Sequence, residues 1–154
     1  VSRTGSGHGS SHLYYAKNSL SGATVVTVSL PSAFCGKEII AAEYSGIDTS
    51  SPLDRTMSNS VYTSSASWTS NPTLLTTQAN ELLIGVGFQF YSKTGVTWTS
   101  GTNWTAVASA NGATNQLFLE EQVVSAIGNY AATGSFSASP SFWYLPLIAT
   151  FKAG

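Results

Sequence analysis

The stretch ELLIGVGFQFY, residues 81–91, decides the fold class of this chain, because its apolar side chains recur at every second position, the period of a β-strand. One face of this strand is continuously apolar: Leu82, Ile84, Val86, Phe88 and Phe90. The opposite face carries two glycines, Gly85 and Gly87, which leave a shallow trough. A bulky neighbouring side chain commonly fills such a trough; otherwise a ligand or another backbone lies there.

The same alternation recurs along the chain in short segments bounded by Gly, Ser, Asn and Pro. The other predicted strands are residues 12–18, 24–30, 38–45, 72–77, 95–100, 104–110, 116–125, 129–137 and 142–152. Helical periodicity is nearly absent. The pattern predicts an all-β protein, an antiparallel β-sandwich of jelly-roll or immunoglobulin-like type with about ten strands.

The domain organisation is simple, because 154 residues suit one domain and no linker divides them. Residues 1–12, VSRTGSGHGSSH, are expected to be a flexible Gly/Ser-rich segment with little strand character. Residues 13–154 are expected to form the single β-sandwich domain. Residues 55–71 are interpreted as irregular, and Pro146, which cannot donate to a ladder, marks an edge position or a bulge.

The composition is poor in charge: 8% of residues are charged, against about 25% in an ordinary soluble domain. Ser, Thr, Asn and Gly take their place, which favours an extracellular or cell-surface location. The net charge is -1 and the cations are scattered, so nucleic-acid binding is not expected. No apolar run reaches the roughly 18 residues of a membrane helix. The single cysteine, Cys35, leaves no internal disulfide.

Three of the seven acidic residues lie in AAEYSGIDTSSPLD, residues 41–54. Glu43, Asp48 and Asp54, with carbonyls of the loop, are candidate ligands for calcium, which takes six to eight oxygens. The competing interpretation, which we favour, is a turn in which Asp48 accepts from the amides of the residues that follow it. No other cofactor is expected.

A pair of glutamates is the basis of an enzymatic hypothesis, a jelly-roll glycoside hydrolase using Glu43 and Glu121. Retaining glycosidases hold two carboxyl groups about 5–5.5 Å apart. Glu120 and Glu121 are neighbours in one predicted strand, so one of them must point inward, where burial would raise its pKa. A buried strand glutamate is more often structural, and this hypothesis is the weakest of the three considered.

The aromatic residues suggest a carbohydrate-binding surface as an alternative. Trp98 and Trp104 lie on a predicted hairpin, and Trp68, Tyr62 and Tyr91 are candidates to extend its surface. Exposed rings beside hydroxyl and amide groups stack on the apolar face of a pyranose. The competing interpretation is that these rings fill the sandwich core, as most aromatic residues do.

Two covalent modifications are also candidates. Asn103 begins the sequon Asn-Trp-Thr, an acceptor for N-linked glycans where the host modifies such sites. Lys17 and Glu43 are a candidate pair for an isopeptide crosslink, which would need the lysine buried beside the acid.

Several longer stretches resemble a β-sandwich module that recurs in large secreted or cell-surface bacterial proteins, often in tandem with immunoglobulin-like or fibronectin-like domains. They are YYAKNSLSGATVVTVSL, AAEYSGIDTSSPLD, TTQANELLIGVG, LEEQVVSAIGNYAATGSF and LIATFKA. The resemblance runs from about Leu13 to the C-terminus. It implies an extracellular setting and a non-catalytic structural or adhesive role, since no catalytic activity is assigned to the module.

One departure from this module generates the main functional hypothesis. Such modules open with further strands before the position that matches LYYAKN, residues 13–18, whereas only VSRTGSGHGSSH precedes it here. The chain is therefore either a fragment or a sandwich whose missing strands are supplied by something else. An open sandwich exposes unpaired backbone that another chain can complete. We expect self-association into a filament or surface layer, or pairing with neighbouring modules, with polysaccharide as the alternative partner.

Overall fold

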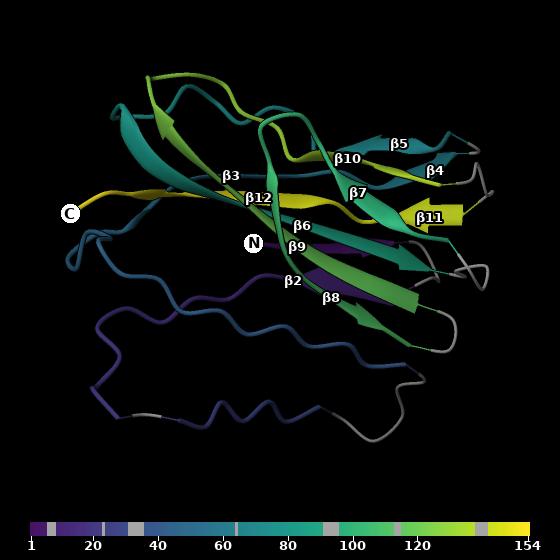
Figure 1. The fold of residues 1–154 in the computed structure, drawn as a ribbon, viewed down its shortest axis with the longest axis horizontal. Coiled ribbons are helices and arrows are strands. Elements are labelled where there is room, and N and C mark those ends of the chain that lie inside the picture. Colours follow the sequence, from purple (N-terminus) through teal and green to yellow (C-terminus); the bar gives the residue numbers. More distant parts are fainter. Residues whose placement is uncertain are drawn as a thin grey trace.

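The computed structural model describes residues 1–5, 9–22, 24–30, 36–63, 65–90, 96–112, 115–137 and 142–154. Within these ranges the protein has twelve strands and no helix, and the strands form antiparallel sheets that pack as a β-sandwich (Figure 1). The all-β prediction is therefore confirmed. The described residues contain no apolar helix that could span a membrane.

The large sheet is built around β6 (Asn80–Phe90), which contains the stretch that sets the fold class. β9 (Asn115–Ser125) pairs with all of β6 on one edge, while β12 (Leu147–Lys152) and then β11 (Phe142–Tyr144) pair with its other edge. The outer strands are β8 (Thr105–Asn111) beside β9, β3 (Leu53–Ser58) beside β12, and β4 (Val61–Thr63) beside β11. Leu145 and Pro146 separate β11 from β12, as expected of a proline in a ladder.

A small sheet covers one face of the large sheet. Its strand order is β5 (Ser67–Thr69), β10 (Thr133–Phe136) and β7 (Trp98–Ser100). Between the two sheets, rings pack in series: Trp98 lies 4.8 Å from Phe118, Phe118 lies 5.5 Å from Phe136, and Phe136 lies 5.2 Å from Tyr144, all between ring centroids. These aromatic contacts form the centre of the core.

The glycine trough of β6 lies inside this core and is filled. A Cβ atom added to Gly87 would lie 2.7 Å from the Phe118 ring and 3.2 Å from Trp68, and one added to Gly85 would lie 2.8 Å from Glu120. The two glycines therefore make room for side chains of the same chain. The hypothesis that this trough receives a strand from elsewhere is wrong.

The other face of β6 is also buried, but no complete sheet covers it. Ile84 and Val86 form a second apolar cluster with Leu147 and Phe151. A hairpin of β1 (Ser2–Gly5) and β2 (Gly9–His12) lies on this side, with Gly9 against the rings of Phe88 and Phe90. The prediction that residues 1–12 have little strand character is wrong, because this apolar face gives a Gly/Ser hairpin something to pack on.

Four predicted strands do not form: residues 12–18, 24–30, 38–45 and 72–77 have no strand assignment beyond His12, the last residue of β2. Alternation specifies which side chains share a face, but a strand also needs a neighbour for its backbone. Conversely, residues 55–71, expected to be irregular, contain most of β3 and all of β4 and β5, because neighbouring strands are available to them.

We predict that Gly134→Ala lowers the free energy of unfolding by about 1–3 kcal/mol, the usual cost of overpacking. A Cβ atom at this position would lie 2.7 Å from Cε2, Cζ2 and Nε1 of Trp68. Chemical denaturation of the variant measures the loss. Adding Trp68→Phe, which removes the outer part of the indole, should recover part of it; strictly additive losses would contradict this packing.

Candidate functional site

The tryptophans lie mostly in the core. Trp68 and Trp104 are only 6% and 9% exposed, so the predicted exposed platform is wrong for both; their rings are large apolar surfaces that the sandwich buries. Trp98 is half-buried and stacks on Phe118. Tyr91 lies outside the described residues.

Tyr62 is the one candidate of this set that is well exposed, at 60%. It lies directly across from Trp143 in the β4–β11 ladder, with 5.3 Å between ring centroids. Sequence analysis missed Trp143, although its alternation with Tyr144 places it on the face of β11 opposite the core. The pair is a small aromatic surface at the edge of the large sheet.

The three candidate calcium ligands bond to separate groups. Asp48 accepts hydrogen bonds from the backbone N–H groups of Ser50 and Ser51, at 2.7 and 2.9 Å, and these bonds lower its pKa. Asp54 accepts from Thr77, and Glu43 accepts from the hydroxyl of Ser19 at 3.2 Å. In the part of the chain that the structure describes, no three acidic, histidine or cysteine side chains gather as metal ligands. The calcium interpretation is therefore not supported, and the turn at Asp48 is confirmed.

The candidate crosslink is not assembled either. Lys17 and Glu43 are both exposed, and the Lys17 ammonium donates to the carbonyl oxygen of Ser50. Spontaneous isopeptide chemistry would need the amine and the acid together in a buried setting. Asn103 is exposed in the turn before β8, with a φ of 68°, so its side chain is accessible to a glycosylating enzyme.

Glu120 is the glutamate of the β9 pair that points inward, fully buried between the sheets. Burial raises the pKa of Glu120 to about 8. The backbone of Gly101 and Thr133 and the hydroxyl of Ser100 lie near the carboxyl group and partly offset this rise. None of these donors forms a hydrogen bond of good geometry with the carboxyl group. The carboxyl is therefore mostly protonated at neutral pH.

Glu121, the other candidate catalytic residue, lies on the opposite face of β9, near Tyr44. Burial and the Glu121 carboxylate both raise the pKa of the Tyr44 hydroxyl. Two hollows on the described surface are lined by other residues, and neither Glu43 nor Glu121 is among them.

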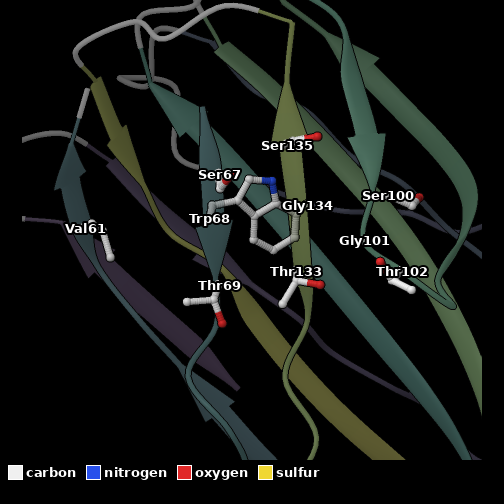
Figure 2. A pocket seen from close by; sticks show the side chains of 10 residues that line it. All are labelled: Val61, Ser67, Trp68, Thr69, Ser100, Gly101, Thr102, Thr133, Gly134 and Ser135. Atoms are coloured by element: carbon white, nitrogen blue, oxygen red, sulfur yellow. The ribbon is translucent and has the colours of Figure 1, made fainter. Parts of the chain in front are cut away.

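A hollow of about 530 Å³ lies on the small sheet (Figure 2). Six of its ten lining residues carry a hydroxyl group, and they come from the three strands and the turn after β7: Ser67, Thr69, Ser100, Thr102, Thr133 and Ser135. Trp68 also borders it, but its indole is buried against Gly134. The hollow therefore offers neutral hydrogen-bonding groups and no exposed ring for stacking.

A second buried acid, Glu81, was not identified from the sequence. It is the second residue of β6 and is 1% exposed, and burial raises its pKa to about 7, with Asp54 adding to the effect. Asp54 behaves in the opposite way, because two hydrogen bonds from Thr77, at 2.6 and 2.7 Å, outweigh its partial burial and lower its pKa. The two carboxyls are 27 positions apart in sequence, so only the β3–β12–β6 pairing brings them together.

The most unusual surface is formed by residues 14–45, which make no backbone hydrogen bond with either sheet in the described part of the chain. Figure 1 shows this region leaving the body of the molecule and returning to it. Its base is tied down by side chains of Lys17, Asn18 and Ser19, which bond to Ser50, Thr49 and Glu43.

Beyond this base, large apolar side chains are exposed. They are 45–84% exposed to solvent: Leu20, Val25, Val26, Val28 and Leu30. In a monomeric soluble protein, apolar side chains gathered on one segment mark an interaction surface.

The fold defines a β-sandwich in which the small sheet covers one face of the large sheet, while in the described residues no complete sheet covers the other face. Comparison with protein-family models, curated proteins and solved structures finds no match.

We predict that the protein is more stable at pH 5 than at pH 8.5. The pKa of Glu120 is about 8 in the folded state and near 4.5 when unfolded, so its contribution is complete below pH 4.5 and is lost as the pH rises through about 8. The expected loss is on the order of 3 kcal/mol, and Glu81 acts in the same direction.

Urea denaturation across this pH range measures the effect, and Glu120→Gln is the matched control. Glutamine keeps the shape of the side chain without a titrating group, so the variant should retain only the smaller Glu81 dependence. Wild-type stability that is constant from pH 5 to pH 8.5 would contradict the assignment.

Proposed function

We propose that this protein is a non-catalytic structural module that associates with copies of itself by strand addition. In this mode an extended segment of one chain pairs with unpaired backbone of another. An extracellular or cell-surface setting suits the low charge of the sequence and the module that it resembles.

The proposal rests on residues 14–45, in which segments with the sequence alternation of a strand have no neighbouring strand in the described structure. The segments 24–30 and 38–45 alternate as strands do, yet neither has a ladder partner among the described residues. Backbone N–H and C=O groups that remain unpaired next to apolar side chains are a template for another strand. A partner strand would pair these backbone groups and cover the apolar side chains at the same time.

The burial available is large enough to matter. Fully burying one Val or Leu side chain stabilises by about 1.5–3 kcal/mol, and five such side chains are exposed from Leu20 to Leu30. The charges that would oppose close approach are absent, because residues 18–30 contain no Asp, Glu, Lys or Arg.

We predict that the purified protein forms oligomers whose average mass rises with concentration in analytical ultracentrifugation. The triple variant Leu20→Ser, Val25→Ser, Val26→Ser should remain monomeric where the wild type associates. Its own free energy of unfolding as a monomer should change by no more than about 0.5 kcal/mol per site, as is usual for exposed positions.

Leu74→Ser, Leu75→Ser is the matched control, since both side chains are also more than half exposed but lie outside residues 14–45. This variant should associate as the wild type does. A wild-type protein that stays monomeric at every concentration would overturn the proposed function.

A further inference from the structure

Residues 38–45 lie across the face of the large sheet that the small sheet does not cover. Ile40 and Tyr44 pack against the second apolar cluster, and the carboxyl group of Glu38 reaches the β8–β9 turn, where it bonds to Asn115. Ile39, Ala41 and Glu43 point to solvent. The segment is therefore anchored by one face in an extended conformation, with its backbone free to accept a strand.

One apolar side chain on the same side of the sheet, Val123, is left uncovered. Leu119, Glu121 and Val123 share one face of β9, the face that pairs with Val86, Ile84 and Leu82 of β6 in the second apolar cluster. Val123, at the end of this row, is 80% exposed. A strand added beside residues 38–45 would be positioned to cover it.

Residues 24–30, TVVTVSL, have the properties of such a strand. Val26, Val28 and Leu30 share one face and are all exposed, and the other face carries Thr27 and Ser29 together with the exposed Val25. No hydrogen bond joins this segment to the sheets in the described part of the chain, and the contacts of residues 17–19 hold the base from which it projects.

We infer that the partner of this site is residues 24–30 of a second copy, added as a strand along residues 38–45. The inference rests on the proposed function and names its two contacting surfaces. Both segments are about the same length, seven and eight residues, or roughly 25 Å when extended. The donor is uncharged, so it can approach Glu38 and Glu43 without repulsion between like charges.

The two surfaces differ, so the contact is heterologous: each copy donates one strand and accepts another. Such contacts generate rings where the rotation between copies closes and open filaments where it does not. One strand alone buries less than the roughly 800 Å² per partner of a standard interface. Each copy inside an assembly uses both surfaces, which doubles the area buried per copy.

Proline variants test this pairing, because proline cannot donate to a ladder. The N–H groups of adjacent residues point to opposite edges of a strand, so a proline blocks pairing only where it replaces an N–H that faces the partner. On the donor, only one of Val26→Pro and Thr27→Pro should therefore block addition. On the acceptor, only one of Ala41→Pro and Ala42→Pro should block it, and in each pair the other variant is the matched control. Each blocking variant should weaken association at least about tenfold.

Mixing the variants gives the decisive result. A blocked-donor copy retains its acceptor and a blocked-acceptor copy retains its donor, so each alone should be monomeric while a 1:1 mixture should form heterodimers in analytical ultracentrifugation. A mixture that stays monomeric would overturn the inference. So would proline variants that assemble like the wild type, although self-association itself, and hence the proposed function, would then stand.

A crosslinking experiment covers the case in which an acceptor proline prevents folding. In a Cys35→Ser background, Val26→Cys protein is mixed with protein carrying either Ala41→Cys or Ala42→Cys and then mildly oxidised. A covalent heterodimer in one of the two mixtures supports the pairing. Its absence from both mixtures, in samples that associate, contradicts the pairing.

Discussion

The structure depends on one constraint: both faces of the central strand β6 are buried along most of its length, so the large sheet needs a layer on each side. The small sheet provides one layer. Phe118 and Trp68 fill the space at Gly87, and Glu120 and Ala132 fill the space at Gly85. On the other side the cover is a short hairpin and side chains from residues 13–47. This asymmetry is the origin of the proposed function.

The two faces of the large sheet also differ in how the polar groups near them are hydrogen-bonded. Between the sheets, Glu120 remains buried because its carboxyl can hold a proton at neutral pH, and Gln89 and Gln116 bond to each other at 2.6 Å. On the incomplete side, the backbone of residues 24–30 and 38–45 is left without ladder partners in the described structure. Buried polar groups are normally satisfied within a domain, whereas exposed backbone is hydrated by water until another strand pairs with it.

Sequence periodicity predicted the sandwich and the long strands β6 and β9 closely, because these strands have both a pattern and an adjacent partner. It also predicted that one of Glu120 and Glu121 must point inward. It failed for residues 24–30 and 38–45 for the opposite reason, since alternation carries no information about which backbone lies alongside. The neighbours Asp54 and Glu81 were missed because sheet pairing, not sequence spacing, brings them together.

The account's central claim is that residues 24–30 and 38–45 are strands without partners in a single copy and become paired on assembly. Amide hydrogen exchange, followed residue by residue in dilute monomer and in concentrated samples, measures this most directly. The account predicts fast exchange in both segments in the monomer and strong protection of both in the assembly, with β6 protected throughout. Protection of both segments already present in the monomer would show that they pair within one chain and would contradict the account.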